Sequence, residues 1–133
     1  KNGVENSFKS PDSINAIDWS LKTKNAATFE KIKQLISIRK AHPAFRMTSS
    51  DAIKKNIRFD KKAPGGTIGY TINGEAVGDS WKKIIVLLNG TDQQKAFSLP
   101  AGKWSKAFTS GYAGAASVKT ISLNKYSAVI LYQ

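Results

Sequence analysis

The chain has 133 residues, 41 % of them hydrophobic, and a formal net charge of +12. This length suits one domain, or one small domain with an attached segment, and the apolar fraction is sufficient for a core. The chain contains no cysteine, which excludes disulfides and thiolate metal sites, and no apolar run of about 18 residues that would predict a membrane span. The lack of cysteine fits a cytosolic protein and an exported bacterial protein equally, so the compartment stays open.

The positive charge is mostly lysine, because Arg39, Arg46 and Arg58 are the only arginines. Lysine is a strongly hydrated point charge that reads phosphates and bases less well than arginine does. The lysines are also spread along the whole chain rather than gathered in one segment. We therefore interpret them as a solvated surface and predict no nucleic-acid partner.

Residues 1–25 are rich in Asn, Ser, Gly, Pro and Asp, which predicts a structured loop. Within it, Ser10 is a candidate N-cap and Pro11 a candidate first residue of a short helix. Polar side chains mixed with aromatic rings are typical of a sugar-binding surface. The two carboxylates also have structural interpretations: Asp12 can serve the helix N-terminus, and Asp18 can bond backbone amides in the following turn.

A helix is predicted at about 26–41, because apolar residues recur there at spacings of three and four. Pro43 ends this helix, since the residue before a proline avoids helical angles. The single histidine, His42, is interpreted as a C-terminal cap that interacts with the helix dipole. The apolar face needs a partner surface, so in isolation the helix should fold back on the rest of the chain or cause self-association. The main residues of this face are Ile32, Leu35 and Ile36.

After Phe45, short runs of β-branched and aromatic residues alternate with turn signals, which predicts an antiparallel β-sandwich. The runs at 83–89 and 126–132 should be central strands, because they are apolar on both faces. Glu75 and Asp79 are expected to be solvated in a loop between strands. The seven predicted strands are 52–60, 67–73, 83–89, 94–99, 103–109, 117–123 and 126–132.

Few residues are candidates for chemistry. With one histidine and no cysteine, a transition-metal site is not expected, and neither a Gly-x-Ser-x-Gly elbow nor a phosphate-binding glycine loop is present. Aromatic residues could act as platforms for sugar rings, although packing at sheet edges is the interpretation we favour for Trp81 and Trp104. The candidate platforms are Trp19, Trp81, Trp104, Tyr70 and Tyr112.

Several motifs resemble type I pullulanases, debranching enzymes of the α-amylase superfamily (glycoside hydrolase family 13). Asn6–Asp12 with Ile14–Trp19 is similar to the segment after the eighth barrel strand of those enzymes, although Phe8 stands where tyrosine is common. Leu35–Arg46 is similar to the final barrel helix of the superfamily. Ile85–Gly90 and Leu99–Trp104 resemble its C-terminal sandwich.

The resemblance implies that residues 1–45 are the last loop and helix of a parent catalytic (β/α)8 barrel, and that residues 46–133 are the C-terminal β-sandwich. It implies a bacterial parent, exported or at the cell surface, that hydrolyses α-1,6-glucosidic linkages in pullulan and branched α-glucans. The family's three catalytic carboxylates lie on barrel strands that precede Lys1. The resemblance therefore implies that this chain holds no catalytic residue and is inactive alone.

For the parent enzyme, the resemblance implies that the sandwich packs on the upstream barrel and stabilises it. It also implies that the opening loop lies on the active-site face, with Asn6, Asp12 and Asn15 as candidates for contacts to sugar hydroxyls. No cofactor is expected, and use of calcium by the parent stays open. The alternative function is an independent carbohydrate-binding module for α-glucans.

Overall fold

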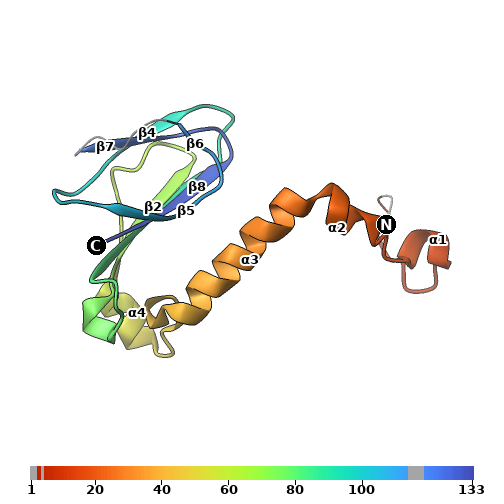
Figure 1. The fold of residues 1–133 in the computed structure, drawn as a ribbon, viewed down its shortest axis with the longest axis horizontal. Coiled ribbons are helices and arrows are strands. Elements are labelled where there is room, and N and C mark those ends of the chain that lie inside the picture. Colours follow the sequence, from red (N-terminus) through yellow and green to blue (C-terminus); the bar gives the residue numbers. More distant parts are fainter. Residues whose placement is uncertain (1–2, 4, 114–118) are drawn as a thin grey trace. The chain divides into compact units, whose positions relative to one another are not determined.

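The computed structural model describes residues 3, 5–113 and 119–133. The chain divides into two compact units, Lys1–Ile32 and Lys33–Gln133. The first unit is helical, and the second contains all the strands that the structure describes (Figure 1).

The first unit holds the short helices α1 (Asp12–Asn15) and α2 (Ser20–Lys24) and the start of α3 (Ala26–Ala41). The prediction of a helix start at Ser10–Pro11 is off by one residue, since Pro11 itself occupies the N-cap and no side chain caps the turn. The ammonium of Lys22 lies 5.2 Å from the ring centre of Phe29, a cation–π contact that ties α2 to the first turns of α3.

The predicted helix at 26–41 is confirmed with the bounds of α3. Its apolar face is divided, however. Leu35 and Ile38 pack against the core of the second unit, whereas Ile32 and Ile36 remain 52 % and 54 % exposed. The helix therefore has a single row of core contacts and a second row of apolar side chains that the chain itself leaves in water.

The segment after α3 differs from its prediction as a strand over 52–60. A 3₁₀ turn, η1 (Pro43–Arg46), leads into helix α4 (Ser50–Asn56), and the strand β1 is limited to Ile57–Phe59. The hydroxyl of Ser49 accepts a hydrogen bond from the N–H of Ala52 at 3.2 Å, which caps α4. The cap stabilises a helix here because it supplies a hydrogen-bond acceptor for an N–H group that has no partner within the helix. The sequence therefore forms a helix, although its apolar residues alternate as in a strand.

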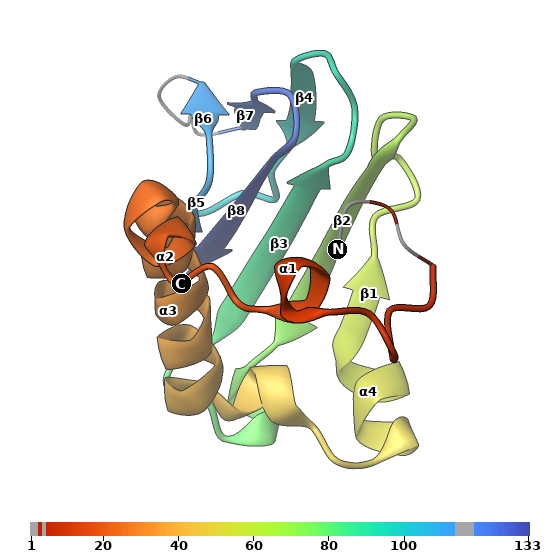
Figure 2. The same cartoon turned by 90° about the vertical axis from the view of Figure 1, so that its right-hand side faces the viewer.

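Two antiparallel sheets follow, with the strand order β1-β2-β3-β8-β5 in the larger and β4-β7-β6 in the smaller (Figures 1 and 2). A 3₁₀ turn, η2 (Glu75–Val77), connects β2 to β3. The register between β5 and β8 shifts at Lys106 to Phe108 through a bulge. The strands after β1 are β2 (Thr67–Asn73), β3 (Lys83–Asn89), β4 (Lys95–Ser98), β5 (Ser105–Thr109), β6 (Tyr112–Ala113), β7 (Thr120–Leu123) and β8 (Ser127–Tyr132).

The antiparallel sandwich predicted from the sequence is thus confirmed, with β3 and β8 central in the larger sheet. The short strand β6 was not predicted, because its sequence reads as a glycine-flanked loop. Residues 117 and 118 of the predicted strand 117–123 lie outside the described part of the chain.

The sandwich has a core on each face of the larger sheet. Between the two sheets, Ile85, Leu87, Val129 and Leu131 meet Phe97, Ile121 and Leu123 from the smaller sheet. On the opposite face, a second cluster packs against α3 and η1. Its buried members are Ala44, Ile72, Ile84, Val86, Phe108 and Ile130.

Asn89 closes one end of the sandwich. Its side chain is 3 % exposed and donates to the carbonyls of Gln93 at 2.7 Å and Asn124 at 2.8 Å. Its carbonyl oxygen accepts from the N–H and the hydroxyl of Thr91. One amide thereby satisfies the backbone of two turns.

Candidate functional site

The opening loop is held together by Asn15. Its side-chain amide donates to the carbonyls of Ser7 at 2.7 Å and Ser10 at 2.9 Å. These two bonds fold residues 7–10 back onto α1. Asn15 was predicted to contact sugar, but its donors are used inside the loop, so in this structure it positions the loop.

Asn6 and Asp12, the other two predicted contact residues, are exposed. The side-chain oxygen of Asn6 accepts from the N–H of Phe8 at 3.2 Å, which leaves its amide N–H groups available. Asn6 and Asn15 line the same shallow hollow as Phe8, whose side chain is 85 % exposed. Asp12 lies in the first turn of α1 and does not line that hollow. The loop thus brings Asn6 and Asn15 together beside an exposed ring and leaves Asp12 apart from them.

Asp18 supports the loop, as its structural interpretation predicted. Its carboxylate accepts from the N–H of Ser20 at 2.9 Å and from the Ser20 hydroxyl at 2.6 Å, and this fixes the turn into α2. The neighbouring Trp19 is 75 % exposed, so its ring has an open face.

Sequence reasoning missed the most strongly organised polar cluster of the second unit. Nδ1 of His42 lies 2.8 Å from Oδ1 of Asp79, and the Asp79 side chain is fully buried. The same carboxylate accepts from the N–H of Trp81 at 2.9 Å and from that of Ala44 at 3.0 Å. The prediction of a solvated Asp79 is wrong, and the His42 side chain bonds this carboxylate rather than acting on the α3 dipole.

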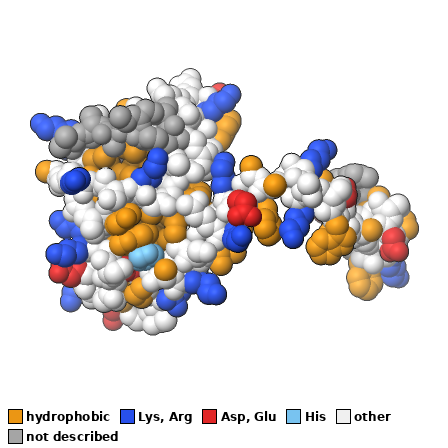
Figure 3. Space-filling model, in the orientation of Figure 1, with side chains coloured by type: hydrophobic (Ala, Val, Ile, Leu, Met, Phe, Trp, Pro, Cys, Tyr) orange, Lys and Arg blue, Asp and Glu red, His pale blue; other side chains and the backbone are white. Residues whose placement is uncertain are grey.

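Aromatic rings extend this cluster. The ring of Trp81 stacks on His42 with centroids 3.4 Å apart, and its other neighbour, Tyr132, lies at 4.2 Å in a second stack. Figure 3 shows hydrophobic side chains gathered around the imidazole. We refer to His42, Asp79, Trp81 and Tyr132 as the histidine clamp, since it joins the end of α3, the β2–β3 connection and the last strand.

The backbone of the β2–β3 connection makes the clamp possible. A Cβ on Gly74 would lie 2.0 Å from the carbonyl oxygen of Trp81, and Gly78 has a φ of +74°, a left-handed conformation that favours glycine. These two glycines let the chain turn tightly enough to aim Asp79 inward. The Asn73-Gly74 pair is a turn signal that can be read from the sequence. The pairing of His42 with Asp79 cannot, because the two residues are 37 positions apart.

The histidine clamp lowers the pKa of the Asp79 carboxylate. Burial by itself would raise the pKa of Asp79, but the hydrogen bonds from His42, Trp81 and Ala44 outweigh it and hold that pKa below its ordinary value. A perturbed carboxylate beside a histidine can mark an active site. Here both oxygens are already bonded and the imidazole is covered by Trp81, so the arrangement is structural.

The remaining candidate platforms differ in availability. Trp104 is half-buried and its indole N–H donates to the carbonyl of Pro100 at 3.0 Å. Tyr70 lies beside Phe59 with ring centres 5.6 Å apart, and burial raises the pKa of its hydroxyl. The side chain of Tyr112 lies outside the described part of the structure.

Within residues 3, 5–113 and 119–133, no group of three or more His, Asp or Glu side chains is arranged to hold a metal ion. No helix formed by the described residues is long and apolar enough to cross a membrane.

Comparisons with known proteins point in one direction. Residues 53–110 match the family described as "Pullulanase, all-beta domain". The pullulanase of Bacillus subtilis (strain 168) is 34 % identical over 99 % of the chain, and the isoamylase of Pseudomonas amyloderamosa is 31 % identical over 72 %. The chain spans only 19 % and 14 % of these two relatives.

Solved structures agree with the sequence matches. The pullulanase of Anoxybacillus sp. LM18-11, solved with maltotetraose, superposes on the whole chain with a TM-score of 0.90 at 33 % identity, and the chain covers 19 % of it. The pullulanase of Bacillus acidopullulyticus gives a TM-score of 0.87 at 34 % identity over the whole chain, which covers 17 % of that protein.

The two-sheet fold and these matches define the chain as an all-β domain, with a helical segment before it, that is related to glycoside hydrolases. More particularly, it matches the C-terminal region of the pullulanases. The resemblance first seen in the Asn6–Asp12 and Leu35–Arg46 motifs is therefore confirmed.

The clamp generates a prediction for pH dependence. The folded pKa of Asp79 is lowered, so its ionised form stabilises the fold above the ordinary carboxyl pKa of about 4, and this contribution is lost as the pH falls through the folded value. Urea unfolding of the wild type should therefore show a decline in the free energy of unfolding below about pH 4 that is smaller in Asp79→Asn. At pH 7 the variant should be about 2–4 kcal/mol less stable.

Asp12→Asn is the matched control, because the Asp12 side chain is exposed. This substitution should change the free energy of unfolding at pH 7 by less than about 0.5 kcal/mol. Equal acid sensitivity of the wild type and Asp79→Asn would contradict the assigned role of Asp79.

Proposed function

We propose that the chain is the non-catalytic C-terminal part of a debranching glycoside hydrolase that cleaves α-1,6-glucosidic linkages in pullulan and branched α-glucans. The observation that carries this proposal is the match of the whole chain to about a fifth of each solved pullulanase, at 33–34 % identity. Residues 1–45 would supply the last loop and helix of the catalytic barrel. Residues 46–133 would form the C-terminal sandwich.

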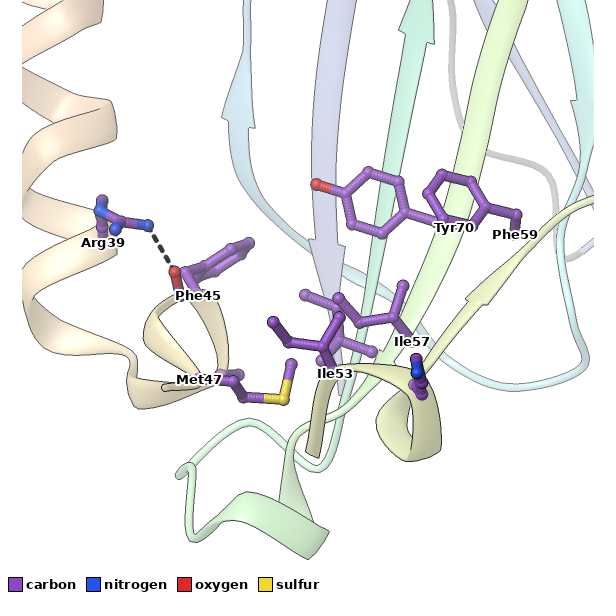
Figure 4. A pocket seen from close by; sticks show the side chains of 10 residues that line it. Arg39, Phe45, Met47, Ile53, Ile57, Phe59 and Tyr70 are labelled. Carbon is purple, nitrogen blue, oxygen red and sulfur yellow. Dashed lines mark hydrogen bonds between the residues drawn. The ribbon is translucent and has the colours of Figure 1, made fainter. Parts of the chain in front are cut away.

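A large apolar groove supports the proposal that the sandwich packs on the barrel. It opens between the end of α3, helix α4 and strands β1 and β2, and its side chains point toward a common space in Figure 4. Arg39 donates to the carbonyl of Phe45 at its margin, so the one charged head that the figure labels there is turned to the backbone. The labelled apolar lining is Phe45, Met47, Ile53, Ile57, Phe59 and Tyr70.

Exposure strengthens this argument. Phe59 is 68 % and Ile53 is 42 % exposed, although both line a groove whose wall includes the buried Ala44 and Ile72. A second, adjoining apolar hollow is lined by Leu35, Ile38 and Phe108. Exposed apolar side chains that gather in one groove can mark a face that another structure covers. The proposed cover is the upstream barrel of the same chain.

The opening loop is the proposed contribution to substrate binding. The Anoxybacillus pullulanase was solved with maltotetraose and with maltotriose, which supports an α-glucan as the partner of the parent enzyme. Asn6 has free amide N–H groups and Asp12 an exposed carboxylate, both suited to sugar hydroxyls. Asn15 would act through the loop conformation that it fixes.

The proposal predicts that the purified 133-residue chain does not hydrolyse pullulan, because barrel active sites are assembled from the ends of several strands. Release of reducing sugar should stay at the level of a buffer blank. A full-length relative, such as the Bacillus subtilis pullulanase, is the positive control. Detectable hydrolysis that co-purifies with the folded chain would overturn the non-catalytic assignment.

The packing role predicts a difference between the isolated chain and the full enzyme. Phe59→Ser should lower the stability of the full enzyme by about 2 kcal/mol, because the ring would be buried against the barrel there. In the isolated chain the loss should be smaller, since the ring is already 68 % exposed.

Thermal inactivation of the full enzyme and urea unfolding of the chain measure the two effects. Tyr126→Ser is the matched control, because Tyr126 is also 68 % exposed but lies in the turn between β7 and β8. Equal effects of Phe59→Ser and Tyr126→Ser on the full enzyme would contradict packing at this face.

If the opening loop contacts the substrate, substitutions in it should affect substrate binding and thermal stability separately. In the full enzyme, Asp12→Ala should raise KM for pullulan about three- to tenfold while leaving the melting temperature unchanged, since Asp12 is exposed. Asn15→Ala should lower thermal stability as well, because two loop hydrogen bonds are lost. If Asp12→Ala changed only the melting temperature, its role would be structural.

A further inference from the structure

The inner face of the larger sheet changes character toward its β1 edge. Over the centre of the sheet, this face carries the apolar residues that meet the smaller sheet. The register places Thr71 opposite Ile85 and Arg58 opposite Thr71, so the same row becomes polar as it leaves β3. In the next row, Asn73 lies opposite Lys83. The sequence therefore provides polar side chains on a face that a complete sandwich would bury.

The smaller sheet does not cover this polar area. β1 and β4 are edge strands of their sheets and lie toward the same side of the sandwich in Figure 2. Side chains from β1, β2 and β4 line one hollow there, and side chains from β1, β2, β3 and the β4–β5 connection line a second. The two hollows share Arg58, Thr71 and Pro100, so they form one continuous depression, which we call the edge groove.

A fixed aromatic ring stands at one end of the edge groove. Trp104 lines it, is half-buried, and packs against the core between the sheets. The hydrogen bond from its indole N–H to Pro100 holds the ring in one orientation. A ring held in this way can stack on the apolar face of a pyranose at little cost in conformational entropy.

The other side chains of the edge groove make it electropositive. The four cations outnumber the two acidic residues that line it, Asp60 and Glu75. The Asp60 carboxylate already accepts from the backbone N–H of Lys62 at 2.8 Å. Within the described part of the chain, none of the three lysines forms an ion pair. The cations are Lys55, Arg58, Lys62 and Lys83.

We propose that the edge groove binds an anionic glycan, a chain of pyranose units that carries carboxylate or phosphate groups. Trp104 would stack on one sugar ring, and Thr71 and Asn73 would bond hydroxyls. Lys83 would bind an acidic group together with the remaining N–H groups of Arg58, whose Nη1 already donates to the carbonyls of Lys54 and Ile57.

Charge complementarity favours an acidic ligand over the neutral α-glucan of the proposed function. Phe59 and Tyr70 also line the edge groove, but their rings pack against each other with centres 5.6 Å apart. Stacking is thus assigned to Trp104 alone, which favours a glycan over single-stranded nucleic acid, whose successive bases stack on several aromatic side chains.

Isothermal titration of the 133-residue chain tests this proposal with four probes: an oligogalacturonate, a phosphorylated maltoheptaose, neutral maltoheptaose and a single-stranded oligonucleotide. The two acidic glycans separate carboxylate from phosphate recognition. At least one should bind about tenfold more tightly than the neutral sugar, with affinity falling as NaCl rises from about 50 to about 500 mM.

The double variant Arg58→Gln/Lys83→Gln should weaken binding of the acidic glycan about tenfold. Lys40→Gln/Lys125→Gln removes the same charge from exposed positions outside the groove and should leave most of the affinity. Circular dichroism confirms that both variants fold. Equal binding of neutral and acidic sugars, tighter binding of the oligonucleotide, equal loss in both double variants, or no binding by any probe would each overturn the proposal.

Discussion

Burial of β3 on both faces is the constraint on which the rest of the structure depends. Ile84 and Val86 face the helical side of the larger sheet, and Ile85 and Leu87 face the smaller sheet. A strand that is apolar on both faces must be covered twice. One cover is β4-β7-β6, and the other consists of the end of α3 with η1. The second cover leaves apolar surface open, and this incompleteness supports the proposal of a barrel neighbour.

The histidine clamp secures that second cover. Ala44 is 1 % exposed, and its N–H bonds the same carboxylate that binds His42, so the turn after α3 is attached to the β2–β3 connection. A buried charge is costly unless it is bonded, and here three hydrogen bonds satisfy Asp79. In the opening loop, the Asn15 amide donates to the carbonyls of Ser7 and Ser10, and Oδ1 of Asp18 accepts from Ser20, so both side chains support the loop. Among the described residues, the Asp12 carboxylate and the amide N–H groups of Asn6 form no hydrogen bond, and these are the groups that we propose for ligand contacts.

Much of the fold was predictable because it depends on local patterns. The bounds of α3 and the central position of β3 follow from hydrophobic periodicity, and the likeness to pullulanases from short motifs. Helix α4 was missed, because residues 52–60 alternate like a strand while the Ser49 cap decides the structure. The His42–Asp79 pair was missed because it depends on tertiary contact across 37 positions, which no spacing rule reveals. In the opening loop, the bonds from the Asn15 amide to Ser7 and Ser10 could not be predicted, because they depend on how the loop folds.

The edges of the larger sheet bear on whether copies of this domain can join strand to strand. One edge strand, β1, has only three residues, and the other, β5, is interrupted by the bulge between Lys106 and Phe108. Short and irregular edges offer few consecutive free N–H and C=O groups to an incoming strand. Any self-association of this domain should therefore proceed through side chains of the apolar groove and stay limited in size, rather than grow by sheet extension into fibrils.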